Sequence, residues 1–143
     1  MNDLIVKTIV RWVIPFIQLF GVYVVFYGHV SFGGGFSGGA LIGASLILHA
    51  ITFGLKESQR IMPHSLSQWF ESMGILWYIA LGLVGSITVS SFLSNKSGGF
   101  LMGEAGQLLS AGIIPLLTIG IGIKVASTMI TLFQKLVEEN GDV

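Results

Sequence analysis

The sequence predicts an all-α membrane protein with four transmembrane helices, and three observations support this prediction. Hydrophobic residues make up 52% of the 143 residues and charged residues only 10%, whereas ordinary soluble domains carry about 25% charged residues. The mean hydropathy is +0.84. The few charged side chains fall between four long apolar runs, and each run is long enough to cross a hydrocarbon core of about 30 Å as a helix.

The four runs predict one membrane domain over residues 1–143. The expected spans are residues 11–27, 38–55, 70–93 and 107–133. Helices are expected because the runs lack the period-two alternation of transmembrane strands. A cleaved signal peptide would need small residues after the first run. The run continues instead through Phe26, Tyr27 and His29, so we expect it to stay in the mature protein.

The distribution of lysine and arginine predicts the orientation in the membrane. Cytoplasmic loops carry an excess of these residues. Five of the six that flank the spans lie before the first span, between the second and third, or after the fourth: Lys7, Arg11, Lys56, Arg60 and Lys135. The third loop carries only Lys96. We therefore expect a multi-pass protein of the cell membrane with both termini in the cytoplasm.

Composition also excludes several classes of function. A formal net charge of zero gives no basic surface for nucleic acid. The absence of cysteine excludes disulfides, thiolate metal ligands and c-type haem attachment. His29, His49 and His64 lie at three different depths, and the sequence pairs no nucleophile with a base. We expect no catalytic residue, no metal and no cofactor.

The densest local feature is a glycine-rich string over residues 28–39, between the first two spans. It contains G-x-G-x-x-G at Gly33, Gly35 and Gly38, but a dinucleotide site needs a strand before this motif and an amphipathic helix after it. A membrane span lies on each side here, so we reject that reading. Gly35, Gly39 and Gly43 recur every four residues, a spacing that lines one helix face and lets another backbone approach closely.

The whole string resembles the signature of the MnhB family, whose members are subunits of the Mrp-type multisubunit sodium/proton antiporters. That signature reads Gly-His, two variable positions, Pro, three Gly, Phe, one variable position and Gly-Gly. Phe32 stands where the family usually has proline, so the loop should be less rigid there. Residues 119–125 are similar to the family's glycine-rich stretch with its intramembrane lysine. The positions that match the signature are Gly28, His29, Gly33, Gly34, Gly35, Phe36, Gly38 and Gly39.

The resemblance implies an accessory membrane subunit of a Na⁺/H⁺ antiporter, a transport subunit rather than an enzyme. Its partners would be the other subunits of an Mrp-type complex, with Na⁺ and H⁺ as the ions concerned. One alternative is the same module in a redox-driven membrane complex, such as a membrane-bound hydrogenase or sulfur reductase. A more distant alternative is an autonomous four-span exporter. Proteins of that class carry an acid in the first span, where this chain has only Gln18.

Polar residues inside the predicted spans indicate an ion path. A lysine at the depth of Lys124 costs about 2.5–3.5 kcal/mol on insertion scales, unless it snorkels to the interface. Spacings of three and four place hydroxyl residues on the same helix face, and a shorter polar stripe lies in the second span. His49 could equally be a buried, hydrogen-bonded histidine. The ion-path candidates are Lys124, Ser127, Thr128 and Thr131 in the fourth span, and Ser45 and His49 in the second.

None of the predicted spans has an acid in its interior, since Glu71 falls at the very start of the third. The countercharge of Lys124 is therefore expected to be water, a backbone carbonyl or an acid from another subunit. A protonated lysine repels Na⁺, which requires several oxygen ligands. Lys124 is thus predicted to carry protons or to act as an electrostatic gate.

Overall fold

The computed structural model describes residues 3–30, 33–89, 92–93 and 112–141. The regular elements of these residues are helices: α1 (Asp3–Tyr27), α2 (Gly34–Phe53), α3 (Leu55–Ile61), α4 (His64–Val89) and α5 (Ile114–Asn140). The four long helices are each long and apolar enough to cross a membrane. The predicted all-α fold with four transmembrane helices is confirmed.

The helices extend beyond the apolar runs that predicted them. The third predicted span begins at residue 70, whereas α4 begins at His64. The fourth ends at residue 133, whereas α5 continues to Asn140. Hydropathy marks only the apolar part of a helix, while backbone hydrogen bonding continues through polar turns such as those around Gln68 and Lys135. Residues 107–111, the predicted start of the fourth span, lie outside the described part of the chain.

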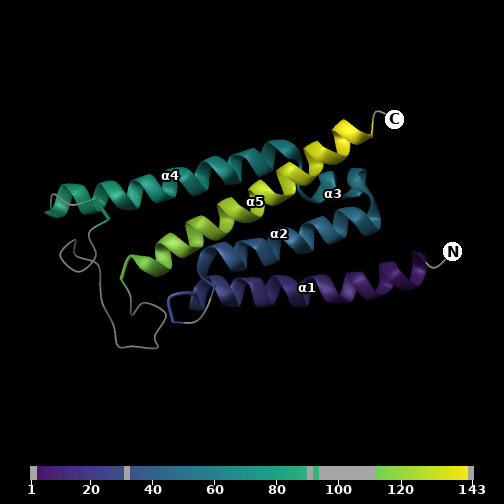
Figure 1. The fold of residues 1–143 in the computed structure, drawn as a ribbon, viewed down its shortest axis with the longest axis horizontal. Coiled ribbons are helices and arrows are strands. Elements are labelled where there is room, and N and C mark those ends of the chain that lie inside the picture. Colours follow the sequence, from purple (N-terminus) through teal and green to yellow (C-terminus); the bar gives the residue numbers. More distant parts are fainter. Residues whose placement is uncertain (1–2, 31–32, 90–91, 94–111, 142–143) are drawn as a thin grey trace.

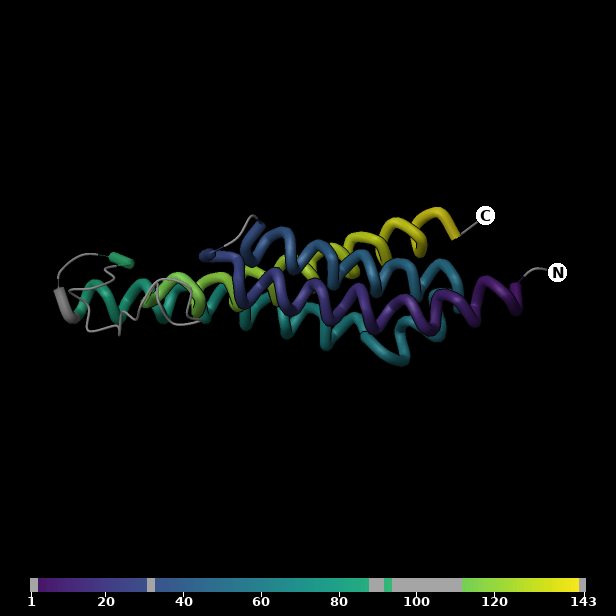
Figure 2. Tube along the Cα trace, turned by 90° about the horizontal axis from the view of Figure 1, so that it is seen from below, coloured from purple at the N-terminus to yellow at the C-terminus, as the bar shows by residue number. Residues whose placement is uncertain are grey.

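The four long helices lie side by side in the order α1, α2, α5, α4 (Figures 1 and 2). α2 packs against α1 on one side and α5 on the other, and α5 packs in turn against α4. α1 and α4 therefore occupy opposite edges of the row, and α5 contacts both of its neighbours along its length. The order in space differs from the order in sequence because α5 inserts between α2 and α4.

Glycines allow α2 to pack closely on both neighbours. A Cβ added to Gly39 would lie 2.5 Å from the carbonyl oxygen of Gly122 in α5, and one added to Gly35 would overlap the backbone of Thr118. On another face, a Cβ added to Gly38 would lie 2.7 Å from the Gly21 carbonyl oxygen of α1. The close approach that the four-residue spacing predicts is thus made to helices of the same chain.

The turn between α1 and α2 requires glycine for its backbone conformation. Gly33 has φ = 120° and Gly34 has φ = 74°, values in the left-handed region that side chains disfavour. A Cβ on Gly28 would overlap Gly34, so the two ends of the turn also approach too closely for a side chain. Residues 31–32 are outside the described residues, and with them the expected effect of Phe32.

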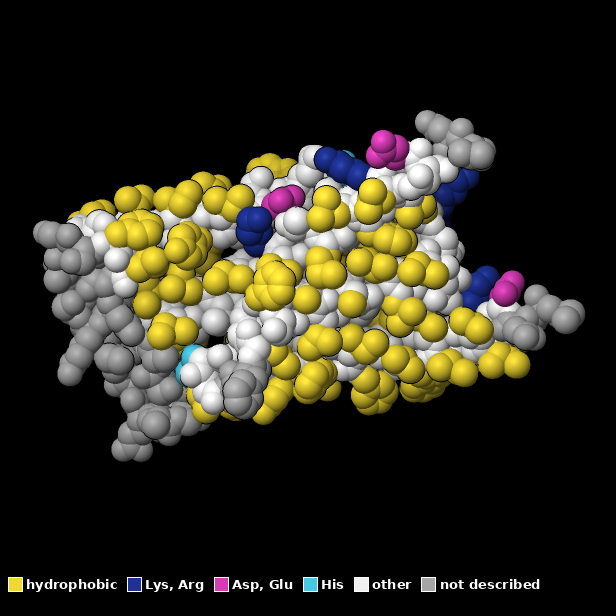
Figure 3. Space-filling view, in the orientation of Figure 1, with side chains coloured by type: hydrophobic (Ala, Val, Ile, Leu, Met, Phe, Trp, Pro, Cys, Tyr) yellow, Lys and Arg dark blue, Asp and Glu magenta, His cyan; other side chains and the backbone are white. Residues whose placement is uncertain are grey.

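Both chain ends and α3 lie at one end of the row, called here the terminal end (Figure 1). On the face shown in Figure 3, most charged side chains gather towards this end. Which side of the membrane the terminal end occupies stays a prediction from the lysine and arginine distribution, which places it in the cytoplasm.

Cysteine labelling tests that orientation, because the chain has no cysteine of its own. Ser65→Cys lies on an exposed position in the first turn of α4. We expect an impermeant thiol reagent to label it only after the cells are opened. Labelling of this position in intact cells would reverse the predicted orientation. Cysteines at positions 2 and 142 should behave like Ser65→Cys and one at position 97 oppositely, and all three lie outside the described residues.

Candidate ion-path site

Lys124 lies in the middle of α5, against a glycine of α4. Helix α5 has proline at its start, Pro115, where the missing N–H costs nothing. Further along α5, the side of the helix that carries Gly120 and Lys124 packs against α4. A Cβ added to Gly74 of α4 would lie 2.9 Å from both the Lys124 Cβ and the Gly120 carbonyl oxygen. The two helices thus touch directly where the lysine side chain begins.

An acid of α4 reaches the same level of this interface. Thr128 Oγ1, one turn after Lys124, donates a hydrogen bond of 3.1 Å to Glu71 Oε1. Glu71 itself lies one turn before Gly74, the residue that touches Lys124. Lys124 and Glu71 are both half-buried.

This arrangement adds an acid of the same chain to the α4–α5 interface, at a position that the sequence places at the start of the third span. Because α4 begins at His64, Glu71 lies two turns inside the helix rather than at its end. Glu71 bonds to Thr128, one turn after Lys124, and the ion pair found among the described residues is Glu57–Arg60 of α3. The countercharge of Lys124 therefore stays a prediction, with Glu71 added as an acid of the same chain on the same interface. The polar residues just before the predicted third span belong to the first turns of α4. A helix that begins at these residues would have placed Glu71 inside it, but hydropathy alone does not show that the helix begins there.

Buried hydroxyl groups continue the polar contact towards the terminal end. Ser67 Oγ of α4 donates to the Ser127 carbonyl oxygen at 3.0 Å and also shares a hydrogen bond with Thr131 Oγ1. One turn further on, Gln134 Nε2 donates to the Met62 carbonyl oxygen at 3.1 Å. Ser67 and Gln134 have no exposed surface. The sequence interpretation named Ser127 and Thr131 but missed these two partners.

We call this set of residues the polar seam. Its members lie on the facing sides of α4 and α5, at spacings of three or four residues along each helix. It contains four of the six ion-path candidates. The polar seam consists of Ser67 and Glu71 of α4 together with Lys124, Ser127, Thr128, Thr131 and Gln134 of α5.

The other two candidates lie elsewhere in the fold. Ser45 is seven residues after Gly38, which packs on α1, so it shares that face. The His49 ring stacks on Phe53 with 4.6 Å between centroids, and the guanidinium of Arg11 in α1 lies 5.7 Å from the same Phe53 ring. The structure therefore does not join the two polar stripes into one route, because the α2–α5 contact lies between the α1–α2 contact and the α4–α5 contact.

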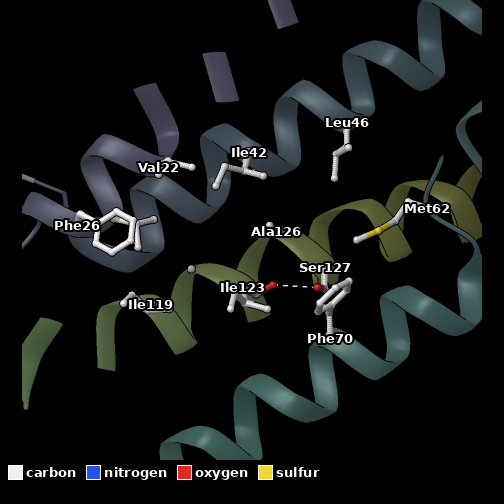
Figure 4. A pocket seen from close by; sticks show the side chains of 12 residues that line it. Val22, Phe26, Ile42, Leu46, Met62, Phe70, Ile119, Ile123, Ala126 and Ser127 are labelled. Atoms are coloured by element: carbon white, nitrogen blue, oxygen red, sulfur yellow. Dashed lines mark hydrogen bonds between the residues drawn. The ribbon is translucent and has the colours of Figure 1, made fainter. Parts of the chain in front are cut away.

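An apolar groove next to the polar seam offers no alternative polar route. Figure 4 shows a groove over α5, between the α1–α2 pair and α4, lined by side chains such as Phe26, Leu46 and Phe70. Its only polar lining side chain, Ser127, donates its hydroxyl to the carbonyl oxygen of Ile123 at 2.8 Å. A groove of this chemistry suits lipid tails or apolar side chains rather than ions.

Comparison with known proteins identifies the family. A family model described as a domain related to the MnhB subunit of Na⁺/H⁺ antiporters matches residues 5–131. The chain belongs to the MnhB family. The matched region includes the glycine turn, α2 and the polar seam as far as Thr131, and the resemblance drawn from the glycine string is confirmed.

Relatives of this MnhB-family chain include bacterial antiporter subunits. It is 29% identical to a Na⁺/H⁺ antiporter subunit of Bacillus subtilis, over 96% of this chain and 95% of that protein. It is 30% identical to the putative antiporter subunit mnhB2 of Staphylococcus aureus, over 94% of each. A Methanocaldococcus jannaschii protein described as uncharacterized is 39% identical over 78% of this chain, which spans 43% of that longer protein.

A solved structure shares the fold. A chain of the membrane-bound sulfane sulfur reductase, an archaeal respiratory membrane complex, superposes on this MnhB-family chain with a TM-score of 0.77 and 29% sequence identity. The match covers 92% of this chain and 56% of that chain. The fold therefore occurs both in a respiratory complex and in a family named after antiporters, and the chain is a multi-pass membrane protein.

Proposed function

We propose that the chain is an accessory membrane subunit of a multisubunit Na⁺/H⁺ antiporter and supports coupled cation and proton translocation. The observation that carries this proposal is the nearly end-to-end similarity to the Na⁺/H⁺ antiporter subunit of Bacillus subtilis, which covers 96% of one chain and 95% of the other. The MnhB-family match over residues 5–131 supports it.

The exposure of the polar seam supports a role inside a larger assembly. Lys124 and Glu71 are only half-buried, so part of each charged side chain faces outward in the middle of a transmembrane region. Charged groups at such depth are costly against lipid and normally face protein or water. A neighbouring subunit packed over the α4–α5 edge would cover them. The chain alone offers no further helix on that side of α4 among its described residues.

The similarity to the sulfane sulfur reductase complex supports a second assignment. In a redox-driven complex the same module would serve ion movement while other subunits carry out the electron transfer. The TM-score of 0.77 makes this assignment compatible with the fold. Under either assignment the chain contributes to transport and the chemistry of any reaction resides in its partners.

Co-purification decides between these assignments. A tagged chain, isolated from its native membrane in mild detergent, should bring down the other antiporter subunits, identified by mass spectrometry. Membrane vesicles from a deletion strain should lose Na⁺-driven proton movement and regain it when the chain is restored. Recovery with hydrogenase or reductase subunits would favour the redox complex. Isolation as a lone chain that catalyses exchange in liposomes would contradict both and favour an autonomous exporter.

A further inference from the structure

The polar seam extends along about half of a membrane thickness. Its described contacts descend α5 from Lys124 to Gln134, ten residues apart, which is about 15 Å at 1.5 Å per residue. The hydrocarbon core of a bilayer is about 30 Å thick. At its terminal end the seam meets the surface near Gln59, whose Nε2 donates to Glu138 Oε1 at 2.6 Å.

One acceptor within the seam is left without a donor. Gln134 has no exposed surface, and its Nε2 is used by the Met62 carbonyl oxygen. Among the described residues, no group donates to Gln134 Oε1. A buried oxygen of this kind is normally satisfied, commonly by a buried water molecule. Gln134 Oε1 is therefore an acceptor that is free to bind a proton donor, one turn beyond Thr131 on the way to the terminal end.

The hydroxyl groups of the seam are spaced for water bridges. Thr128, Thr131 and Gln134 follow one another at three-residue intervals on one face of α5, with roughly 5–6 Å between successive Cβ atoms. A single bridging water spans such a gap at little cost. Ser67 connects Thr131 directly to the backbone of Ser127, one turn earlier, through its bonds to both residues.

Beyond Lys124 the same interface becomes apolar. Towards the opposite end, α4 and α5 meet through Trp77, Ile119 and Ile123, and a Cβ on Gly120 would lie 2.6 Å from the indole ring of Trp77. The indole N–H of Trp77 is used by the Leu116 carbonyl oxygen at 2.9 Å. No described polar side chain carries the seam through this half. The polar route therefore ends at the Lys124–Glu71 level.

We propose that the polar seam is a proton half-channel that connects the terminal end of the chain to Glu71. From Glu71 the proton leaves this chain laterally, through the edge formed by α4 and α5. This inference rests on the proposed function and adds the ion, the route and the group that binds it. The carboxylate of Glu71 takes a proton from the neighbouring water and returns it to water, or to a base of the covering subunit, in the next step. Lys124 stabilises the carboxylate when the proton has left.

A proton suits this seam better than Na⁺. Na⁺ needs several oxygen ligands in one place, whereas the seam spreads its oxygens one turn apart and sets a lysine beside its only carboxylate. The charged and titratable groups on the packed helices are few. Lys124 of α5 lies against Gly74 of α4, one turn from Glu71. His64 of α4 lies two turns nearer the terminal end than Glu71, and Lys135 of α5 lies three turns nearer it than Lys124.

The test replaces polar side chains of the seam by apolar side chains of similar shape. Thr131→Val and Gln134→Met, each in the intact complex, should lower the proton movement measured in everted membrane vesicles by at least about tenfold, which corresponds to a barrier raised by about 1.4 kcal/mol. Thr118→Val is the matched control. It removes a buried hydroxyl from the same helix, bonded to the Pro115 carbonyl oxygen, on the face that packs on α2, and should leave the rate unchanged.

Glu71 separates a proton-binding role from a structural one. Gln can still accept the hydrogen bond of Thr128 but cannot take up a proton, so Glu71→Gln should abolish proton movement while the complex assembles. Glu71→Asp should retain part of it. Wild-type rates in Glu71→Gln would overturn the half-channel even if the other variants failed to assemble, as would wild-type rates in both Thr131→Val and Gln134→Met. Transport that survives deletion of the whole chain would instead overturn the proposed function.

Discussion

Gly39→Leu is expected to abolish the packing of α2 on α5 and, with it, the accumulation of the folded chain in its complex. A Cβ at this position already lies 2.5 Å from the Gly122 carbonyl oxygen and 3.0 Å from the Val125 Cβ. These are backbone and branched side-chain atoms that cannot move aside. Overpacking usually costs about 1–3 kcal/mol, and a leucine must separate two helices that the whole row depends on.

The measurement is the amount of chain in the membrane and in the purified complex. Ala44→Leu is the matched control, because Ala44 lies on the same helix and is exposed. It adds similar apolar volume without meeting α5 and should accumulate like the wild type. Since Leu raises the hydropathy of α2 in both variants, membrane insertion itself should be unaffected. Recovery of Gly39→Leu in a full-size, active complex would show that α2 and α5 do not pack as described.

Lys124→Ala is expected to lower ion exchange by at least about tenfold, which is a barrier raised by about 1.4 kcal/mol, in a complex that still assembles. The variant leaves the Glu71 carboxylate without the positive charge across the α4–α5 interface. Lys124→Arg should not restore the full rate, because arginine keeps its proton and carries a larger, planar head. A lysine that merely snorkels predicts the reverse, since removing its charge from the membrane would relieve a cost.

Exchange in everted vesicles, with subunit levels measured in parallel, distinguishes these two roles. Lys135→Ala is the control, because Lys135 is exposed near the terminal end of the same helix and should be replaceable at no cost in rate. The double variant Lys124→Ala/Glu71→Ala should assemble at least as well as Lys124→Ala, since it removes the unpaired acid, yet remain slow. A fully active Lys124→Ala complex would reduce the lysine to a packing residue.

Local patterns were sufficient for the identity of the chain and for most of the helices. The signature residues Gly28, His29 and Gly33 onward identify the family because their spacing reflects a backbone turn that only glycine adopts, as the φ values of Gly33 and Gly34 show. Lys124 was recognised because a lysine in an apolar run is costly wherever the helix packs. None of these inferences depends on which helix is the neighbour of which.

The candidate site could be predicted only in part. Ser127, Thr128 and Thr131 were found by helical periodicity, which places them on one face. Glu71, Ser67 and Gln134 were missed because the first two lie in the polar turns of α4 and the third looks like an exposed end of α5. Their contacts join residues between 57 and 72 positions apart in sequence, which no local pattern encodes.

The sequence by itself determined that this protein crosses a membrane four times and belongs to the MnhB family, because hydropathy and backbone turn requirements act over a few residues. Only the tertiary structure decided that α5 lies between α2 and α4. That order places the glycine face of α2 against the chain's own α5, brings Glu71 of α4 to Thr128 of α5, and separates His49 from the polar seam. The physical reason is that each helix face could pack against any of several helices. Which helix it packs against depends on the packing free energy summed over all four long helices.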